Sequence, residues 1–303
     1  MIFKNKLILL LTCLCSLVQM NCSNSEKKTP ILKLDNRESV QLSMGNISYT
    51  DKGVGQLIIL LHAAGHDLRD YDSIYNELAK SYRVIALDWI GHGMSDYPTP
   101  LESISAVVLA NTLQEFVIKL NLPPSILIGN SVGAFSAGSL AISNPDKVKA
   151  LVLVDSGGFI EIDTKTKLFC KFKGTEFWTG VLWNLFPSYY LKQRNEYVKG
   201  ILENIKNKKS DKAISVNAAI WRSFVSPDHD LRERAKNIQT PTLLVWGKND
   251  PVIPLEIGKK AEKIIPNSKM IILETGHIPF AEDPEGFLKI VIPFLNKVSI
   301  NKS

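Results

Sequence analysis

Residues 128–133 read Ile-Gly-Asn-Ser-Val-Gly, and this stretch determines how the rest of the chain is interpreted. It directly follows an apolar run, Ser125–Ile128, and opens a run with helical spacing, Ser131–Ser143. A Gly-x-Ser-x-Gly pattern between a strand and a helix is typical of a sharp turn that lifts the serine hydroxyl clear of a sheet. The same pattern also fits a glycine-rich turn with an ordinary capping serine. Ser131 is therefore a candidate nucleophile whose support must come from elsewhere in the chain.

Short apolar runs alternate with longer amphipathic runs on both sides of this stretch. This alternation predicts an α/β fold with a mostly parallel sheet and helices on both of its faces. Uninterrupted apolar runs fit a sheet that is buried on both sides. The expected strands are Ile47–Tyr49, Leu57–Leu61, Val84–Leu87, Ser125–Ile128, Leu151–Val154, Thr242–Trp246 and Met270–Leu273, and the expected helices are Ser105–Leu120, Ser131–Ser143, Leu255–Ile264 and Pro284–Leu295.

The alternation breaks between Phe159 and Lys236, where aromatic residues are frequent and strand signals are absent. We interpret this segment as a helical insertion between two strands of the sheet. The chain then divides into a signal at 1–22, a tether and first strand region at 23–45, a core at 46–158 and 237–299, and the insertion at 159–236.

The first residues predict export. Lys4 and Lys6 precede an apolar run, Leu7–Val18, which is too short for an ordinary membrane-spanning helix. The run ends near Cys22, and a polar stretch follows, an arrangement that resembles a bacterial lipoprotein signal. That resemblance implies a lipid anchor on Cys22 and an exported, membrane-anchored protein. Simple cleavage, giving a periplasmic or secreted protein, and an uncleaved anchor are the alternatives.

Composition limits the remaining classes of function. The 303 residues are 45% hydrophobic, enough for a substantial core. The net charge of +6 comes from scattered lysines and arginines without interleaved aromatic residues, so we expect no nucleic-acid partner. The cysteines are Cys13, Cys15, Cys22 and Cys170, and their spacing matches no zinc pattern, so we expect no metal.

A serine hydroxyl is a poor nucleophile without a base, and the chain has five histidines. His277 directly follows the last expected strand, where a loop can return to the carboxyl edge of the sheet. Asp250 follows the expected strand Thr242–Trp246, and its carboxylate could hold the imidazole in the required tautomer. Asp155 also ends an expected strand and is a rival for the acid. We favour Asp250.

With these residues in the order Ser, Asp, His, the chain resembles the α/β-hydrolase superfamily from about Ile47 to Leu295. The segment Leu60–Gly65 is similar to the family's oxyanion loop. The resemblance implies that the backbone N–H groups of Ala64 and Val132 form the oxyanion hole. Ala63 stands where the family usually has glycine.

Three further segments carry the resemblance. Residues 86–95 are similar to a structural Asp-x-x-Gly-x-Gly-x-Ser stretch, which implies that His92, and likewise His62, pack loops. Residues 276–284 match the family's terminal histidine segment. The insertion at 159–236 lies where the family has its cap, so its aromatic residues would line an apolar pocket or pack the cap itself.

The resemblance implies hydrolysis of a small-molecule carboxylic ester or related acyl bond through an acyl-enzyme, with no metal or organic cofactor. Carbon–carbon bond hydrolases of the meta-cleavage type are an alternative, with Asn111 as an oxyanion-region residue. Their glycine-rich oxyanion loop and their tryptophan after the histidine are replaced here by Ala63-Ala64 and Ile278. Haloalkane dehalogenases and epoxide hydrolases use an aspartate nucleophile, which Ser131 argues against.

Two further alternatives to hydrolysis of a small soluble ester remain: binding without catalysis, and lipid hydrolysis at a membrane. A lipid-anchored binding protein without turnover would be expected to lack a member of the triad. A lipase acting at a membrane is the other. His66 could contact substrate, but we expect it to be an exposed loop histidine.

Overall fold

The computed structural model describes residues 37–300. The expected signal and the Cys22 tether therefore lie outside the described residues. Eight strands form one sheet in the order β1-β2-β4-β3-β5-β6-β7-β8. They are β1 (Arg37–Leu42), β2 (Gly45–Lys52), β3 (Leu57–Leu61), β4 (Arg83–Leu87), β5 (Ser125–Asn130), β6 (Val148–Val154), β7 (Thr242–Gly247) and β8 (Ser268–Leu273).

The sheet is mostly parallel, which confirms the predicted α/β architecture. β2 pairs antiparallel with β1 and β4, whereas every other neighbouring pair is parallel. β1 lies within the segment 23–45, where a first strand region was expected, but its bounds were not predicted because most of its residues are exposed or half-buried and offer no apolar run. The antiparallel hairpin therefore forms one edge of the sheet.

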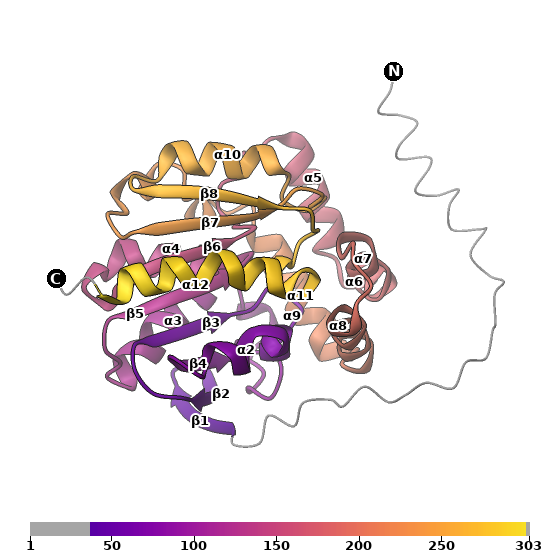
Figure 1. Ribbon diagram of the computed structural model, residues 1–303. Coiled ribbons are helices and arrows are strands. Elements are labelled where there is room, and N and C mark those ends of the chain that lie inside the picture. The colour runs from indigo at the N-terminus through magenta and orange to yellow at the C-terminus, as the bar shows by residue number, and fades with distance from the viewer. Residues whose placement is uncertain (1–36, 301–303) are drawn as a thin grey trace. The chain divides into compact units, whose positions relative to one another are not determined.

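Alternate residues of the central strands enter two different cores, as the pleat of a strand requires. On β3, Ile59 and Leu61 belong to one apolar cluster, and Ile58 and Leu60 belong to the other. Figure 1 shows α12 in front of the sheet with α3 and α4 behind it. The first cluster packs under α3 (Ala106–Lys119), α4 (Val132–Ser143) and α10 (Leu255–Ile264), and the second under α2 (Asp72–Leu78), α11 (Pro279–Glu282) and α12 (Pro284–Ile300).

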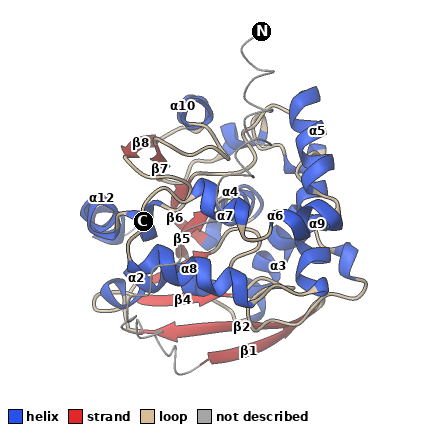
Figure 2. Ribbon diagram, turned by 90° about the vertical axis from the view of Figure 1, so that its right-hand side faces the viewer, coloured by secondary structure: helices blue, strands red, loops and turns tan. Residues whose placement is uncertain are grey.

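The segment between β6 and β7 is helical and holds no strand within residues 155–241, which agrees with the interpretation of a helical insertion. Figure 1 shows its helices on the right-hand side of the molecule, Figure 2 turns that side toward the viewer, and we call this group the cap. The helices are α5 (Thr164–Lys173), α6 (Glu176–Leu182), α7 (Leu185–Tyr190), α8 (Glu196–Asn207) and α9 (Asp211–Ser223). Across residues 37–300, no helix combines the length and the apolar character needed to cross a membrane.

Candidate active site

Ser131 lies between β5 and α4 on a strained turn, with φ +56° and ψ −115°. Gly129 and Gly133 flank this turn, and neighbouring backbone leaves no room for a side chain at either position. A Cβ on Gly129 would lie 2.5 Å from the carbonyl carbon of Gly133, and a Cβ on Gly133 would lie 2.1 Å from the carbonyl oxygen of Leu61. Any larger residue would therefore push α4 away from the sheet. The half-buried Ser131 is held at the exit of the strand, as its sequence pattern suggests.

His277 and Asp250 come together from the loops after β8 and β7. The His277 Nδ1 atom lies 2.7 Å from Asp250 Oδ2, and both residues are buried. The other oxygen, Asp250 Oδ1, accepts hydrogen bonds from the backbone N–H groups of Val252 (2.7 Å) and Ile253 (3.2 Å). Because a carboxylate accepts, Nδ1 carries the proton and Nε2 is left with a free lone pair. This is the tautomer that a general base requires.

Asn130 connects the serine turn to the histidine loop. Its buried amide Nδ2 donates to the carbonyl oxygens of Val154 (3.2 Å) and His277 (3.0 Å). The residue directly before Ser131 thus fixes the backbone of the base. The sequence analysis quoted Asn130 only as part of a motif, because its partner lies 147 positions away.

The loop after β3 is held by two neutral histidines. His92 Nε2 accepts a hydrogen bond from the N–H of Gly65 (3.0 Å), and His62 Nε2 accepts one from the N–H of Trp89 (3.1 Å). Burial lowers the pKa of His92 to about 4, and the pKa of His62 falls well below its ordinary value for the same reason. Both rings therefore fix the path of the loop that carries Ala64, in agreement with the expected packing role.

A model of the α/β-hydrolase fold matches residues 56–284. The chain belongs to the α/β-hydrolase family. Several relatives of known sequence carry hydrolase names. The chain is 28% identical over 273 residues to 2-hydroxy-6-oxononadienedioate/2-hydroxy-6-oxononatrienedioate hydrolase 2 of Pseudomonas putida, covering 82% of this chain and 91% of that protein. It is 25% identical to an uncharacterized hydrolase of Bacillus subtilis, covering 79% of this chain and 90% of the other.

Solved structures show the same fold. An esterase from Thermogutta terrifontis superposes with a TM-score of 0.74 at 22% identity, covering 87% of this chain and 99% of the esterase. An enol-lactonase from Burkholderia xenovorans LB400 gives a TM-score of 0.73 at 20% identity, covering 86% of this chain and 100% of the lactonase.

His66 of this α/β hydrolase differs from its expectation as an exposed loop residue, because it is 4% exposed. Its Nδ1 atom lies 2.8 Å from the Asp70 carboxylate, and its Nε2 lies 2.5 Å from the hydroxyl of Tyr190 on cap helix α7. The Tyr190 ring packs edge-on against His277 at 5.4 Å between centroids, and its carbonyl oxygen accepts the His277 N–H (3.2 Å). Tyr190 therefore links the cap to both loops, a role that sequence reasoning missed because no local pattern marks it.

Asp155, the rival acid, lies next to the preferred acid of the hydrolase. It is fully buried at φ +42°, and its Oδ1 accepts the N–H of Gly247 (2.9 Å). The pKa of Asp155 is raised well above its ordinary value, mainly by burial and next by the negative charge of Asp250. Burial therefore favours the protonated form of Asp155, whereas the carboxyl group of Asp250 is the one in direct contact with the imidazole of His277.

Proximity alone would also make these three residues a candidate metal site. The nearest ligand atoms of Asp155, Asp250 and His277 lie within 4.8 Å of one another. The side chains are nevertheless engaged with each other and with backbone N–H groups, since His277 Nδ1 and Asp250 Oδ2 are already hydrogen-bonded. The arrangement fits acid–base chemistry better than metal ligation.

Glu282 on α11 holds the loop that carries the base. Its buried carboxylate accepts hydrogen bonds from four backbone N–H groups, two that flank His277 and two in the cap segment after α7. The donors and their distances are Lys192 (2.7 Å), Gln193 (3.0 Å), Gly276 (3.0 Å) and Ile278 (3.2 Å). The sequence analysis included this residue in a family segment without giving it a function.

We expect Glu282→Gln to lower the free energy of unfolding by about 2–4 kcal/mol, because the amide NH₂ would face backbone donors and leave them buried without an acceptor. Ester turnover should fall as well, since the His277 loop loses its support. Urea unfolding and turnover would be compared with those of Glu285→Gln, an exposed position on α12. Equal stability of the two variants would show that this carboxylate does not hold the loop.

Asn111, considered for an oxyanion role, is exposed on α3. An oxyanion group must reach the reacting carbonyl, so the assignment of Asn111 was wrong. Helical periodicity explains the error, because it places Asn111 on the solvent side of α3 while Ala110 and Thr112 face inward.

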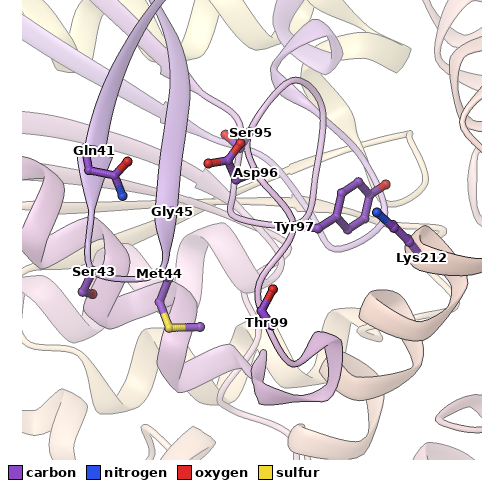
Figure 3. Close-up of a pocket in the computed structure, with 9 residues that line it drawn as sticks. All are labelled: Gln41, Ser43, Met44, Gly45, Ser95, Asp96, Tyr97, Thr99 and Lys212. Carbon is purple, nitrogen blue, oxygen red and sulfur yellow. The ribbon is translucent and has the colours of Figure 1, made fainter.

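A surface hollow of about 670 Å³ lies between the β1–β2 turn, the loop after β4 and the start of α9. Figure 3 shows its lining, with Lys212 beside the Tyr97 ring. Asp96, its acidic residue, already accepts hydrogen bonds from the backbone and side chain of Asn46. No residue of the candidate triad lines this hollow, so it is separate from the site described above.

Proposed function

We propose that this α/β hydrolase cleaves a carboxylic ester or related acyl bond, with Ser131 as nucleophile, His277 as base and Asp250 as acid. The hydrogen bond from His277 Nδ1 to Asp250, together with a serine held at positive φ on the turn after β5, is the observation that carries the proposal. The family supports hydrolysis, and the geometry supports this division of roles.

In the proposed reaction, His277 Nε2 takes the proton of the Ser131 hydroxyl as the oxygen attacks the ester carbonyl. The tetrahedral intermediate collapses, the bond to the alcohol breaks, and His277 returns the proton to the leaving oxygen. Water then attacks the acyl-serine, again giving its proton to His277, and the acid is released with Ser131 restored. Asp250 stabilises the imidazolium at both stages.

The developing oxyanion needs donors aimed at it before the reaction begins. We assign the N–H of Val132, the first residue of α4, and that of Ala64. Val132 lies at a helix N-terminus, where the macrodipole also favours negative charge. The histidine-braced loop after β3 gives Ala64 a fixed backbone.

Carbon–carbon bond hydrolysis is the second candidate. The observation that favours it is the similarity to the Pseudomonas putida hydrolase, whose named substrates are dienedioates and trienedioates with an oxo group. Three observations argue against carbon–carbon bond hydrolysis. Ile278 stands where those enzymes have a tryptophan after the histidine, and Ala63-Ala64 replace their glycine-rich oxyanion loop. Asn111 is exposed.

The test is a turnover screen over esters of increasing acyl chain length, with lactones and a vinylogous diketone. We expect hydrolysis of short esters. Cleavage of the diketone without ester turnover would assign carbon–carbon hydrolysis instead. A protein that turns over none of these substrates, and that resists fluorophosphonate labelling, would be a binding protein.

We also propose that the enzyme is exported and lipid-anchored at Cys22, on the strength of the sequence pattern alone. Mass spectrometry of the mature N-terminus is the test. A diacylglyceryl cysteine at position 22 is expected, and an unmodified N-terminus at any other position would exclude the anchor.

A further inference from the structure

Lys173, the last residue of cap helix α5, is a buried cation without an anionic partner. It is 3% exposed, and its Nζ lies 5.1 Å from the ring centroid of Phe186 and 5.6 Å from that of Trp221. Within residues 37–300, no carboxylate forms an ion pair with this ammonium. Two neighbours on the same helix, Lys167 and Lys171, are exposed to solvent.

Burying an ammonium is unfavourable unless a counter-charge or hydrogen bonds replace its water. The faces of two aromatic rings replace only part of that hydration. Burial lowers the pKa of Lys173 to about 8, so the side chain remains mostly protonated at neutral pH. A methionine or leucine would fill the same space without this penalty. The cation therefore indicates an anion that the described protein does not itself supply.

A continuous series of aromatic rings connects Lys173 to the candidate triad. Phe186 packs against Tyr190 with 5.2 Å between ring centroids, and Tyr190 packs against His277 at 5.4 Å. The rings of Phe186 and Tyr190, both on α7, thus lie between the ammonium and the base, and we call these two rings the wall. A molecule reacting at His277 and extending along this wall would place its far end at Lys173.

A second series of rings begins at the same lysine. Trp221 packs against Phe224 at 5.2 Å, Phe224 against His229 at 4.9 Å, and His229 against Phe135 at 4.5 Å, one turn of α4 after Ser131. The first series therefore ends at the candidate base, and the second ends at Phe135, whose backbone N–H donates to the carbonyl oxygen of Ser131 (3.0 Å).

Polar atoms without protein partners occur along this interior. His229 is 9% exposed, and its Nδ1 lies 3.1 Å from the carbonyl oxygen of Phe224, so Nδ1 carries the proton and the buried Nε2 lone pair has no partner. Asn217 on α9 also has a buried Oδ1 without a partner. Its amide lies against Gly65 in the loop after β3. These two acceptor atoms could bind polar groups of a ligand whose apolar part contacts the aromatic rings.

We propose that the substrate carries a carboxylate remote from its scissile bond, and that Lys173 binds this carboxylate under the cap. The inference rests on the proposed ester hydrolysis and names its substrate class. One ammonium with one positive charge matches a singly charged carboxylate, whereas a phosphate dianion would require further donors. The aromatic rows supply the apolar surface along which the connecting methylene chain lies.

The experiment compares two series of p-nitrophenyl esters. One consists of half-esters of succinate, adipate, suberate and sebacate, and the other of the corresponding neutral acyl esters. We expect wild type to prefer the half-ester by about 10- to 100-fold in kcat/KM at the chain length that spans the wall. Lys173→Met should remove that preference through KM while keeping turnover of the neutral esters. Lys171→Met is the matched control and should behave as wild type.

Two results would overturn the inference. One is a wild-type enzyme that prefers neutral esters at every length, and the other is a preference that survives in Lys173→Met. Turnover of neutral esters distinguishes these outcomes from failure of the proposed function. Calorimetric titration of Ser131→Ala protein with monomethyl adipate and with dimethyl adipate gives a readout that does not require turnover. Stronger binding of the monoanion is expected, and equal or weaker binding contradicts the proposal.

Discussion

Replacing Ser131 with alanine should reduce ester turnover by about 10⁴- to 10⁶-fold and abolish labelling by a fluorophosphonate. Without the hydroxyl no acyl-enzyme forms, and the oxyanion donors alone give little acceleration. The fold should persist, because alanine keeps the Cβ that Ser131 already accommodates at φ +56°. Circular dichroism and thermal unfolding would verify this, and kcat would be measured on the best ester of the screen.

Ser139 on the same helix provides the matched control. Its hydroxyl has no hydrogen-bond partner within the described residues, so Ser139→Ala removes a hydroxyl without removing a contact. That variant should retain labelling and turnover. If Ser131→Ala remained fully labelled, the nucleophile would lie elsewhere and the proposed triad would be wrong.

Asp250→Asn should lower kcat by about 10⁴-fold, because an amide facing Nδ1 can donate to it and thereby favour the wrong imidazole tautomer. Asp155→Asn should lower kcat by less than about tenfold. Asparagine has nearly the same shape as aspartate, keeps an oxygen for the Gly247 N–H and places no charge beside Asp250. Steady-state kinetics of the two variants distinguish the carboxylates, and the reverse ranking would make Asp155 the acid.

The raised pKa of Asp155 beside Asp250 also predicts that the free energy of unfolding depends on pH. The pKa of Asp155 is raised in the folded protein, so above the ordinary aspartate pKa the folded state holds a proton that the unfolded chain has released. This contribution to stability falls as pH increases from the ordinary value toward the raised one. Asp155→Asn lacks it, so the variant should gain stability relative to wild type across that window in urea unfolding. A constant difference between the two proteins would show that Asp155 does not titrate there.

Local patterns predicted much of the site and of the sheet. The turn at 128–133 was recognisable because its two glycines and its serine lie at a single strand–helix junction. Adjacent backbone leaves no room for a side chain at either glycine. The buried strands were recognisable because a sheet covered on both faces requires uninterrupted apolar runs. Ser131, Asp250 and His277 were candidates for the same reason, since each directly follows an expected strand.

Long-range contacts decided what these patterns left open. β6 and β7 are neighbours in the sheet, so Asp155 and Asp250 reach the same place, and the sequence favoured Asp250 only through its flanking residues, without showing which carboxyl group contacts the imidazole. Burial of His66 depends on a tyrosine 124 positions away, and the unpaired charge of Lys173 depends on how the cap helices pack. The sequence by itself determined the chemical groups and the junctions that carry them. Only the tertiary structure decided which groups are desolvated and what each one touches, because desolvation and contact are properties of segments brought together from distant parts of the chain.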